Sequence, residues 1–256
     1  MSAERTGSLR LDVVGAGPAY TDRPGATGAS YLVSHAESAV LLDLGQGSFP
    51  RLANLLDPGE LDSVLISHLH PDHFIDLVAL RHYLRWGPDH PRRVRVIGPR
   101  GLGDRIDALH AEPGFSAAAL DLEPLAPGHL LIGSLDVDVA PVTHAAESYA
   151  FRVALAGRPG LVYSGDCGRA EDLDVLMRPG DTLLSEVSFG PGPVPPGAAH
   201  MDGPTVGALA ARTRAGRVLL THLLMGHDEA RTVASAQRAY DGPVGVVHPG
   251  DTFTLD

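Results

Sequence analysis

Residues 63–73 read Ser-Val-Leu-Ile-Ser-His-Leu-His-Pro-Asp-His, so a short apolar run leads directly into a dense group of possible metal ligands. The group comprises His68, His70, Asp72 and His73. A straight strand could not bring all four to one ion, because its alternate side chains point to opposite faces. A turn at Pro71 would divide them into two neighbouring groups, and imidazole and carboxylate are ligands that zinc and similar ions prefer. A polar loop with chance histidines is the alternative, but the density of ligands favours a metal site.

Three more polar residues follow apolar runs elsewhere in the chain. His144 ends LDVDVAPVTH, Asp166 ends LVYSGD and His222 ends RVLLTH. A lone histidine at the end of a strand is usually an ordinary surface residue. Together with the first cluster, however, these residues place five histidines and two aspartates at the ends of predicted strands. We therefore expect them to converge at one edge of a sheet system.

The remaining segments alternate between strand-like and helical patterns. Alternation of polar and apolar residues in 135–142 and 148–155 is typical of antiparallel strands, and the continuous apolar runs 62–67 and 217–222 are typical of strands covered on both faces. Further strands are predicted at 9–14, 29–34, 39–44, 93–98, 161–165, 182–187 and 244–248. Helices are predicted at 73–86, 101–110, 169–178, 203–214 and 226–240. This order predicts one α/β domain over residues 1–256, an αββα sandwich of two sheets with helices on both outer faces.

Composition excludes several classes of protein. Apolar residues make up 44% of the 256 residues, which is normal for a globular protein. No apolar run approaches the roughly 20 residues that cross a bilayer, and the amino terminus does not resemble a signal peptide, so we expect a cytoplasmic protein without a membrane partner. The net charge of −11 argues against stable nucleic-acid binding. It does not exclude a small anionic substrate, because bound metal ions can dominate the local charge.

The ordered motifs HLHPDH (68–73), VTH (142–144), YSGD (163–166) and LLTH (219–222) resemble those of the metallo-β-lactamase superfamily, over nearly the whole chain. HAAESYAFRV (144–153) and LLSEVSF (183–189) are similar to the ribonuclease Z-like branch, in particular to bacterial cyclic-nucleotide phosphodiesterases. The resemblance implies two divalent metal ions, zinc first and manganese or iron as alternatives. Flavodiiron oxygen reductases carry a glutamate where His70 stands, which disfavours redox chemistry. The implied ligands are His68, His70 and His144 for one ion, Asp72, His73 and His222 for the other, and Asp166 as the bridge.

The same resemblance implies the catalytic groups. His200, paired with Glu186, would protonate the leaving alkoxide, an effect typically worth ~10²–10⁴-fold in rate. Asp72 would also orient the nucleophile or accept its proton. The alternative is that His200 is an ordinary residue of a loop rich in Pro and Gly, and Glu186 a solvated strand end.

Substrate size follows from one interval of the sequence. Ribonuclease Z carries an arm for transfer RNA between the third histidine and the bridging aspartate, but here only 22 positions separate residue 144 from residue 166. A small phosphodiester such as a cyclic nucleotide is therefore expected, which makes transfer-RNA 3′ processing less favoured. Hydrolysis of a lactone or thioester and a non-catalytic metal-binding role remain alternatives.

Several other features have weaker interpretations. The loop GAGPAY (15–20) is expected to form a tight turn near the metals, and it departs from the sequence usual in the family. His227 is expected to start a helix rather than border the pocket, and His248 to lie outside the site. Cys167 is expected to be a packing residue. The apolar helix predicted at 73–86 could contribute to a homodimer contact.

Overall fold

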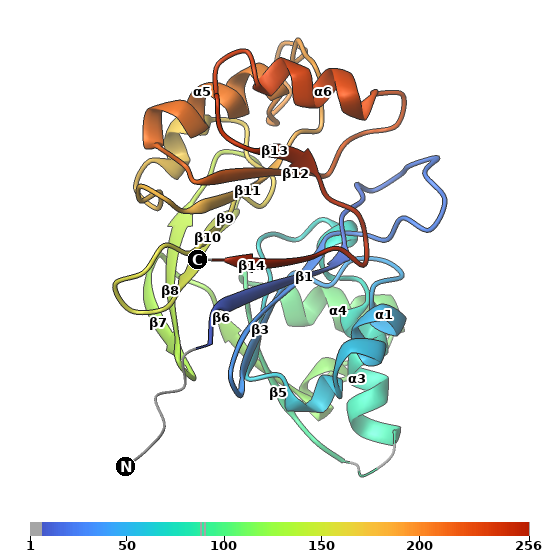
Figure 1. The fold of residues 1–256 in the computed structure, drawn as a ribbon. Coiled ribbons are helices and arrows are strands. Elements are labelled where there is room, and N and C mark those ends of the chain that lie inside the picture. The colour runs from blue at the N-terminus through green and yellow to red at the C-terminus, as the bar shows by residue number, and fades with distance from the viewer. Residues whose placement is uncertain (1–6, 88, 90, 256) are drawn as a thin grey trace, which may run out of the picture.

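The computed structural model describes residues 7–87, 89 and 91–255. The chain forms two seven-stranded sheets that face each other, with helices on both outer faces (Figure 1). This arrangement is the predicted αββα sandwich. Among the described residues, no helix combines the length and the apolar character needed to cross a membrane.

The first sheet is antiparallel at one side and parallel at the other. The three pairings among β14, β1, β2 and β3 are antiparallel, and those from β3 through β6 are parallel. In spatial order its strands are β14 (Thr252–Leu255), β1 (Leu9–Gly15), β2 (Ser30–His35), β3 (Ser38–Leu42), β4 (Ser63–Leu65), β5 (Val94–Gly98) and β6 (Leu120–Pro124).

The second sheet has the same mixed character. The pairings from β10 through β13 are parallel and those from β7 through β10 antiparallel. In spatial order its strands are β13 (Val244–Val246), β12 (Arg217–Thr221), β11 (Thr182–Glu186), β10 (Leu161–Tyr163), β9 (Tyr149–Ala154), β8 (Leu135–Pro141) and β7 (Gly128–Ile132).

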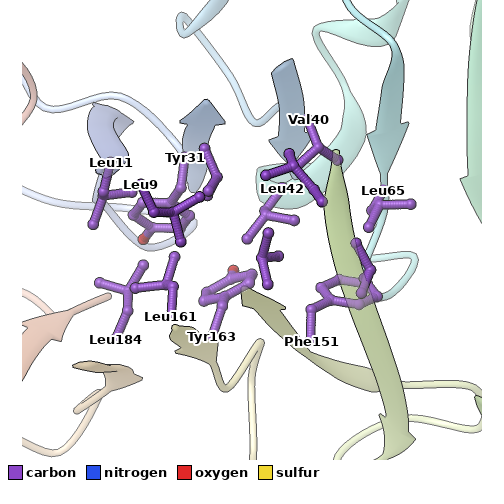
Figure 2. Close-up of a cluster of buried hydrophobic side chains, with 14 of the residues drawn as sticks. Leu9, Leu11, Tyr31, Val40, Leu42, Leu65, Phe151, Leu161, Tyr163 and Leu184 are labelled. Carbon is purple, nitrogen blue, oxygen red and sulfur yellow. The ribbon is translucent and has the colours of Figure 1, made fainter. Parts of the chain in front are cut away.

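The central core fills the space between the two sheets. Leu11 and Tyr31 of the first sheet face Leu161 and Tyr163 of the second, and all four side chains are almost fully buried (Figure 2). Strand β4 shows why a continuous apolar run was needed. Leu65 faces this core while its neighbour Val64 packs under the helices outside, so both faces of the strand are covered as predicted.

Helices cover each outer face through one apolar side. The first sheet is covered by α1 (Phe49–Leu55), α3 (Leu77–Trp86) and α4 (Leu102–His110), and the second by α5 (Gly203–Thr213) and α6 (Glu229–Ala236) (Figure 1). The apolar side of α3 is occupied by this packing, since Leu77, Leu80 and Leu84 are buried in its own domain core. A dimer contact through that side of the helix is therefore not available, and the oligomeric state stays a prediction.

Several predicted elements differ from the structure. The segment 73–86 forms two helices, α2 (Pro71–Phe74) and α3, because the carbonyl of His73 and the N–H of Asp76 bond to the backbone of Leu44 instead of within a helix. The helix predicted at 169–178 is wrong: only a 3-10 turn, η3 (Ala170–Leu173), forms there. Leu173 is buried and the Asp172 carboxylate accepts the N–H of Thr143, so tertiary contacts hold the segment as successive turns.

Other differences concern elements whose sequences carry weak signals. Strands β6 and β7 contain Pro and Gly and are largely exposed, so no apolar alternation marks them. Helix α1 has only seven residues and begins with a Pro, and helix α6 is shorter than the predicted 226–240. The remaining short elements are the 3-10 turns η1 (Pro58–Glu60) and η2 (Ser116–Ala118).

Candidate metal centre

The seven predicted ligands lie together where strands of both sheets end. His68 follows β4, His70 precedes α2, and the short helix α2 carries the next two. The other three follow β8, β10 and β12 of the second sheet, so the centre is built from both sheets. The candidate ligand atoms of these seven residues fall into two groups, each within 4.8 Å: His68, His70, His144 and Asp166 in the first group, and Asp72, His73 and His222 in the second group. A third group of the same size overlaps them and consists of Asp166, His200 and His222.

The first group consists of three converging imidazoles and one carboxylate oxygen. The Nδ1 atom of His70 lies 3.0 Å from the Nε2 atoms of both His68 and His144. Oδ2 of Asp166 lies 3.7 Å from Nε2 of His68 and 3.5 Å from Nε2 of His144. Atoms about 2.1 Å from one tetrahedral ion are about 3.4 Å apart, so these separations fit a single divalent metal.

The second group is organised around the other oxygen of the same aspartate. Nε2 of His222 lies 3.2 Å from Oδ2 of Asp72, and Nε2 of His73 lies 3.6 Å from that oxygen. Oδ1 of Asp166 is 3.4 Å from Nε2 of His73 and 3.5 Å from Nε2 of His222. Each oxygen of Asp166 therefore faces a different group, as a bridging carboxylate would.

Two buried atoms of this cluster have no hydrogen-bond partner among the residues that the structure describes. Nε2 of His73 and Oδ1 of Asp166 are inaccessible to solvent and make no hydrogen bond. A buried polar atom without a partner costs about 1–3 kcal/mol, so natural proteins rarely keep one without a ligand or ion to satisfy it. The donor set fits a pair of divalent ions, and the two clusters are consistent with the dinuclear site typical of this fold.

Asp43 supports the histidines of both groups, and the sequence analysis missed this residue. Its Oδ2 accepts hydrogen bonds of 2.7 Å from Nδ1–H of His73, from the Ser67 hydroxyl and from the Tyr163 hydroxyl. Ser67 in turn lies 3.1 Å from Nδ1 of His68. Asp43 is fully buried, and the only sequence signal was an acidic residue at the end of the apolar run AVLLDL. Such partners fix the ring orientation and raise the basicity of a ligating nitrogen.

Two further histidines are oriented in the same way. Nδ1–H of His144 donates to the carbonyl of Ala199 at 2.9 Å, and Nδ1 of His222 lies 3.0 Å from the Ser188 hydroxyl oxygen. Each contact leaves Nε2 free to face the centre of the cluster. The tautomer needed for metal binding is therefore set by the surrounding protein.

Burial and charge shift the pKa values of the cluster in opposite directions. Burial holds the pKa of His68 well below its usual range. Burial acts on His73 too, but the carboxylates of Asp166 and Asp43 outweigh it and hold the pKa of His73 well above its usual range. Burial alone would raise the pKa of Asp166, yet His222 and His73 hold it well below the usual range. The Asp166 carboxylate is therefore ionised throughout the neutral pH range.

A histidine–glutamate pair lies beside the first group. Nδ1–H of His200 donates to Oε1 of Glu186 at 2.9 Å, and the His200 ring centre is 4.7 Å from that of His144. Glu186 is buried at the end of β11 and accepts the Ser188 hydroxyl at 2.7 Å, so it is not a solvated strand end. Burial lowers the pKa of His200, but the hydrogen bond to Glu186 outweighs this and raises it. The arrangement can hold and release a proton at Nε2 of His200.

The weaker predictions fall outside the metal cluster, apart from the glycine-containing loop. The carbonyl of Ala16 accepts the N–H of His222 at 3.0 Å, which places this loop against a predicted ligand. His227 precedes Asp228, the cap of α6, and its ring contacts Phe189. His248 is mostly exposed and lies 3.1 Å from Glu229, away from the two groups. Burial raises the pKa of the Cys167 thiol to about 12, as expected of a packing residue.

The chain matches a known family over most of its length. Residues 40–223 match the Beta-lactamase superfamily domain. The uncharacterized protein ML1173 of Mycobacterium leprae is 30% identical over 97% of this chain and 89% of its own length. The probable metallo-hydrolase YhfI of Bacillus subtilis is 25% identical over 94% of this chain and 98% of its own length.

Solved structures show the same fold. The crystal structure of YhfI from Bacillus subtilis has a TM-score of 0.83 at 21% identity and covers 96% of this chain and 99% of that chain. The short form of human tRNase Z has a TM-score of 0.73 at 19% identity, with 96% and 99% covered. From the family match and the seven converging ligands, the chain is a member of the metallo-β-lactamase superfamily.

Proposed function

We propose that the chain is a dinuclear metal-dependent hydrolase of small phosphodiesters, with cyclic nucleotides as the leading substrate class. The observation that carries the proposal is the carboxylate of Asp166, whose two oxygens face two ligand groups beside the His200–Glu186 pair. Membership of the superfamily and a relative described as a probable metallo-hydrolase support the hydrolase part. Solved structures with this fold include a tRNase Z and a diphosphatase of the PhnP family, which supports phosphoester chemistry.

The proposed roles follow from the positions of the side chains. Two divalent ions, zinc first, would lower the pKa of a shared water and stabilise charge on the attacking and leaving oxygens. Asp166 offsets part of their charge, and Asp72 orients the attacking water or accepts its proton. The water oxygen forms the new bond to phosphorus as the bond to the leaving oxygen breaks. His200 gives the Nε2 proton to that oxygen while Glu186 holds Nδ1–H in place.

The proposal of a small substrate has its own support. Between His144 and Asp166, strands β9 and β10 are joined by residues 155–160, so this interval contains no arm that could hold transfer RNA. The net charge of −11 also disfavours a long polyanion. We therefore place recognition in the immediate surroundings of the metal centre.

The first test is a substrate panel on protein loaded separately with zinc and with manganese. The panel contains 3′,5′-cyclic AMP, bis(4-nitrophenyl) phosphate, a thioester and a lactone, and Asp166→Ala controls for contaminating activity. Turnover of both phosphodiesters, lost in the variant, is the expected result. Turnover of the acyl compounds alone would overturn the proposed substrate class.

The role of His200 is tested by the leaving group. A 4-nitrophenolate leaves without a proton, whereas the ribose alkoxide of cyclic AMP needs one. We expect His200→Ala to lower kcat for cyclic AMP by ~10²–10⁴-fold and to change turnover of the nitrophenyl ester far less. His129→Ala, a change at an exposed histidine of β7, is the matched control. Equal losses on both substrates would exclude His200 as the proton donor.

A further inference from the structure

A pocket of about 220 Å³ lies beside the metal centre, and no step of the proposed mechanism uses it. It is enclosed by the loop 16–26, the ends of β12 and β13, and helix α1. Thr221, His222 and Leu223 form part of its wall, so a predicted metal ligand borders both the pocket and the centre. Of the seven predicted ligands, His222 alone is part of this lining.

Arg51 lines this pocket from helix α1. Its Nε atom is buried without a hydrogen-bond partner, and within residues 7–87, 89 and 91–255 its guanidinium has no ion-pair partner. A partly buried cation without a partner is costly, whereas a guanidinium binds carboxylate or phosphate through two parallel hydrogen bonds. An anionic group in the pocket would supply the missing acceptors.

The other charged residues of the pocket are already paired. Arg23 donates to the carbonyls of Leu223 and His227 and lies 3.2 Å from Glu229, so it anchors the loop. Glu229 also lies 3.1 Å from Nε2 of His248. The two arginines and one glutamate leave one positive charge in the lining, and that charge belongs to Arg51.

The rest of the lining is mainly apolar. Ala16, Val246, Val247 and Pro249 contribute to it. A cavity of about 150 Å³ accepts a benzene molecule, so this pocket has room for one ring with a charged substituent.

We propose that this pocket binds the part of the substrate that is not cleaved: a ring bearing a carboxylate or phosphate that pairs with Arg51. This inference rests on the proposed function and narrows its substrate class. Within the phosphodiesters, the favoured substrate then carries a second negative charge, as a cyclic dinucleotide does and 3′,5′-cyclic AMP does not. Arg51 contacts that second charge and discriminates between substrates, while the hydrolytic step is left to the metal centre.

The test compares two phosphodiesters that share a leaving group. These are 4-nitrophenyl phenyl phosphate and 4-nitrophenyl 3-carboxyphenyl phosphate, assayed on the zinc-loaded protein. We expect the wild type to show the lower KM for the carboxylated diester. Arg51→Gln should raise that KM about tenfold, because a charge-assisted pair is lost, and leave kcat and the uncharged diester unchanged. Arg51→Lys should keep part of the preference.

Controls separate this inference from the proposed function. Arg238→Gln changes an exposed arginine of the same charge outside the pocket and should alter neither KM. Should neither diester be turned over, calorimetric titration with 3-carboxyphenyl phosphate and phenyl phosphate measures the pocket directly, and Arg51→Gln should weaken only the former. Equal KM values for both diesters in the wild type, or an equal change of both in Arg51→Gln, would overturn the assignment.

Discussion

The two ligand groups of the centre differ in how firmly the protein holds them. Asp72, His73 and His222 are all buried, at 5%, 0% and 4% exposure. In the first group His70 is exposed and His144 lies in a loop, although His68 is fully buried. The second group is thus set by the interior of the fold, and the first is open at His70. We infer that substrate reaches the centre over the first group, while the second group keeps its position in the interior of the fold.

The difference has an electrostatic origin. His73 has carboxylates on both sides, Asp43 at Nδ1 and Asp166 near Nε2, whereas His70 bonds only to other histidines. Burial lowers the pKa of His70 and neighbouring imidazoles add to the effect. Without metal, His73 therefore carries a compensated charge in the interior while His70 stays neutral near the surface.

The largest effect is expected when one histidine of each group is removed from the metal-free protein and the two losses of stability are compared. His73→Ala removes the imidazole that lies between the buried Asp43 and Asp166 carboxylates, so we expect the free energy of unfolding to fall by about 3–5 kcal/mol. His70→Ala removes an exposed ring and should change it by about 0.5 kcal/mol or less. Urea unfolding of both variants after chelation gives the two values. Similar losses would contradict the distinction between a buried and an open group.

An intermediate effect is expected at the residues behind the ligands. Asp43→Asn keeps the shape of the side chain and removes the charge that supports His73 directly and His68 through Ser67. We expect the affinity for at least one ion to fall ~10–100-fold. Competition with a chromogenic zinc chelator measures this.

Ser67→Ala provides the matched variant, since Ser67 is the link to His68 alone. It should weaken one ion and leave the other unchanged. Loss of both ions to the same degree in the serine variant would show that the two groups do not bind independently.

The smallest effect is expected in the pH dependence of activity, which His200 beside the first group should set. The Glu186 carboxylate raises the pKa of His200, so the protonated acid persists to higher pH than for a free histidine. Activity on cyclic AMP should fall as pH rises through this raised pKa. Glu186→Gln removes the charge and should move that alkaline limb to lower pH. A pH–rate profile on zinc-loaded protein measures the shift. If the alkaline fall in activity stayed at the same pH in Glu186→Gln, a group other than His200 would cause it.

The sequence allowed the two-sheet fold and the convergence of the seven ligands to be predicted, because each ligand follows an apolar run. Asp43 was not found, since its role depends on Ser67, His73 and Tyr163 meeting across two sheets. The helix expected at 169–178 failed for a similar reason: its apolar spacing is satisfied by turns that contacts elsewhere hold in place. The Arg51 pocket joins residues as far apart in the sequence as Ala16 and Pro249, and no local pattern marks it.

The division of the predicted ligands between the two sheets affects how the sheets separate when the protein unfolds. His68, His70, Asp72 and His73 follow strand β4 of one sheet, and His144, Asp166 and His222 follow strands of the other. Ions held by both sets would clamp the two halves together at one edge. Binding energy of this kind adds to the barrier that separates the halves. Protein loaded with metal ions should then resist protease longer than the metal-free protein.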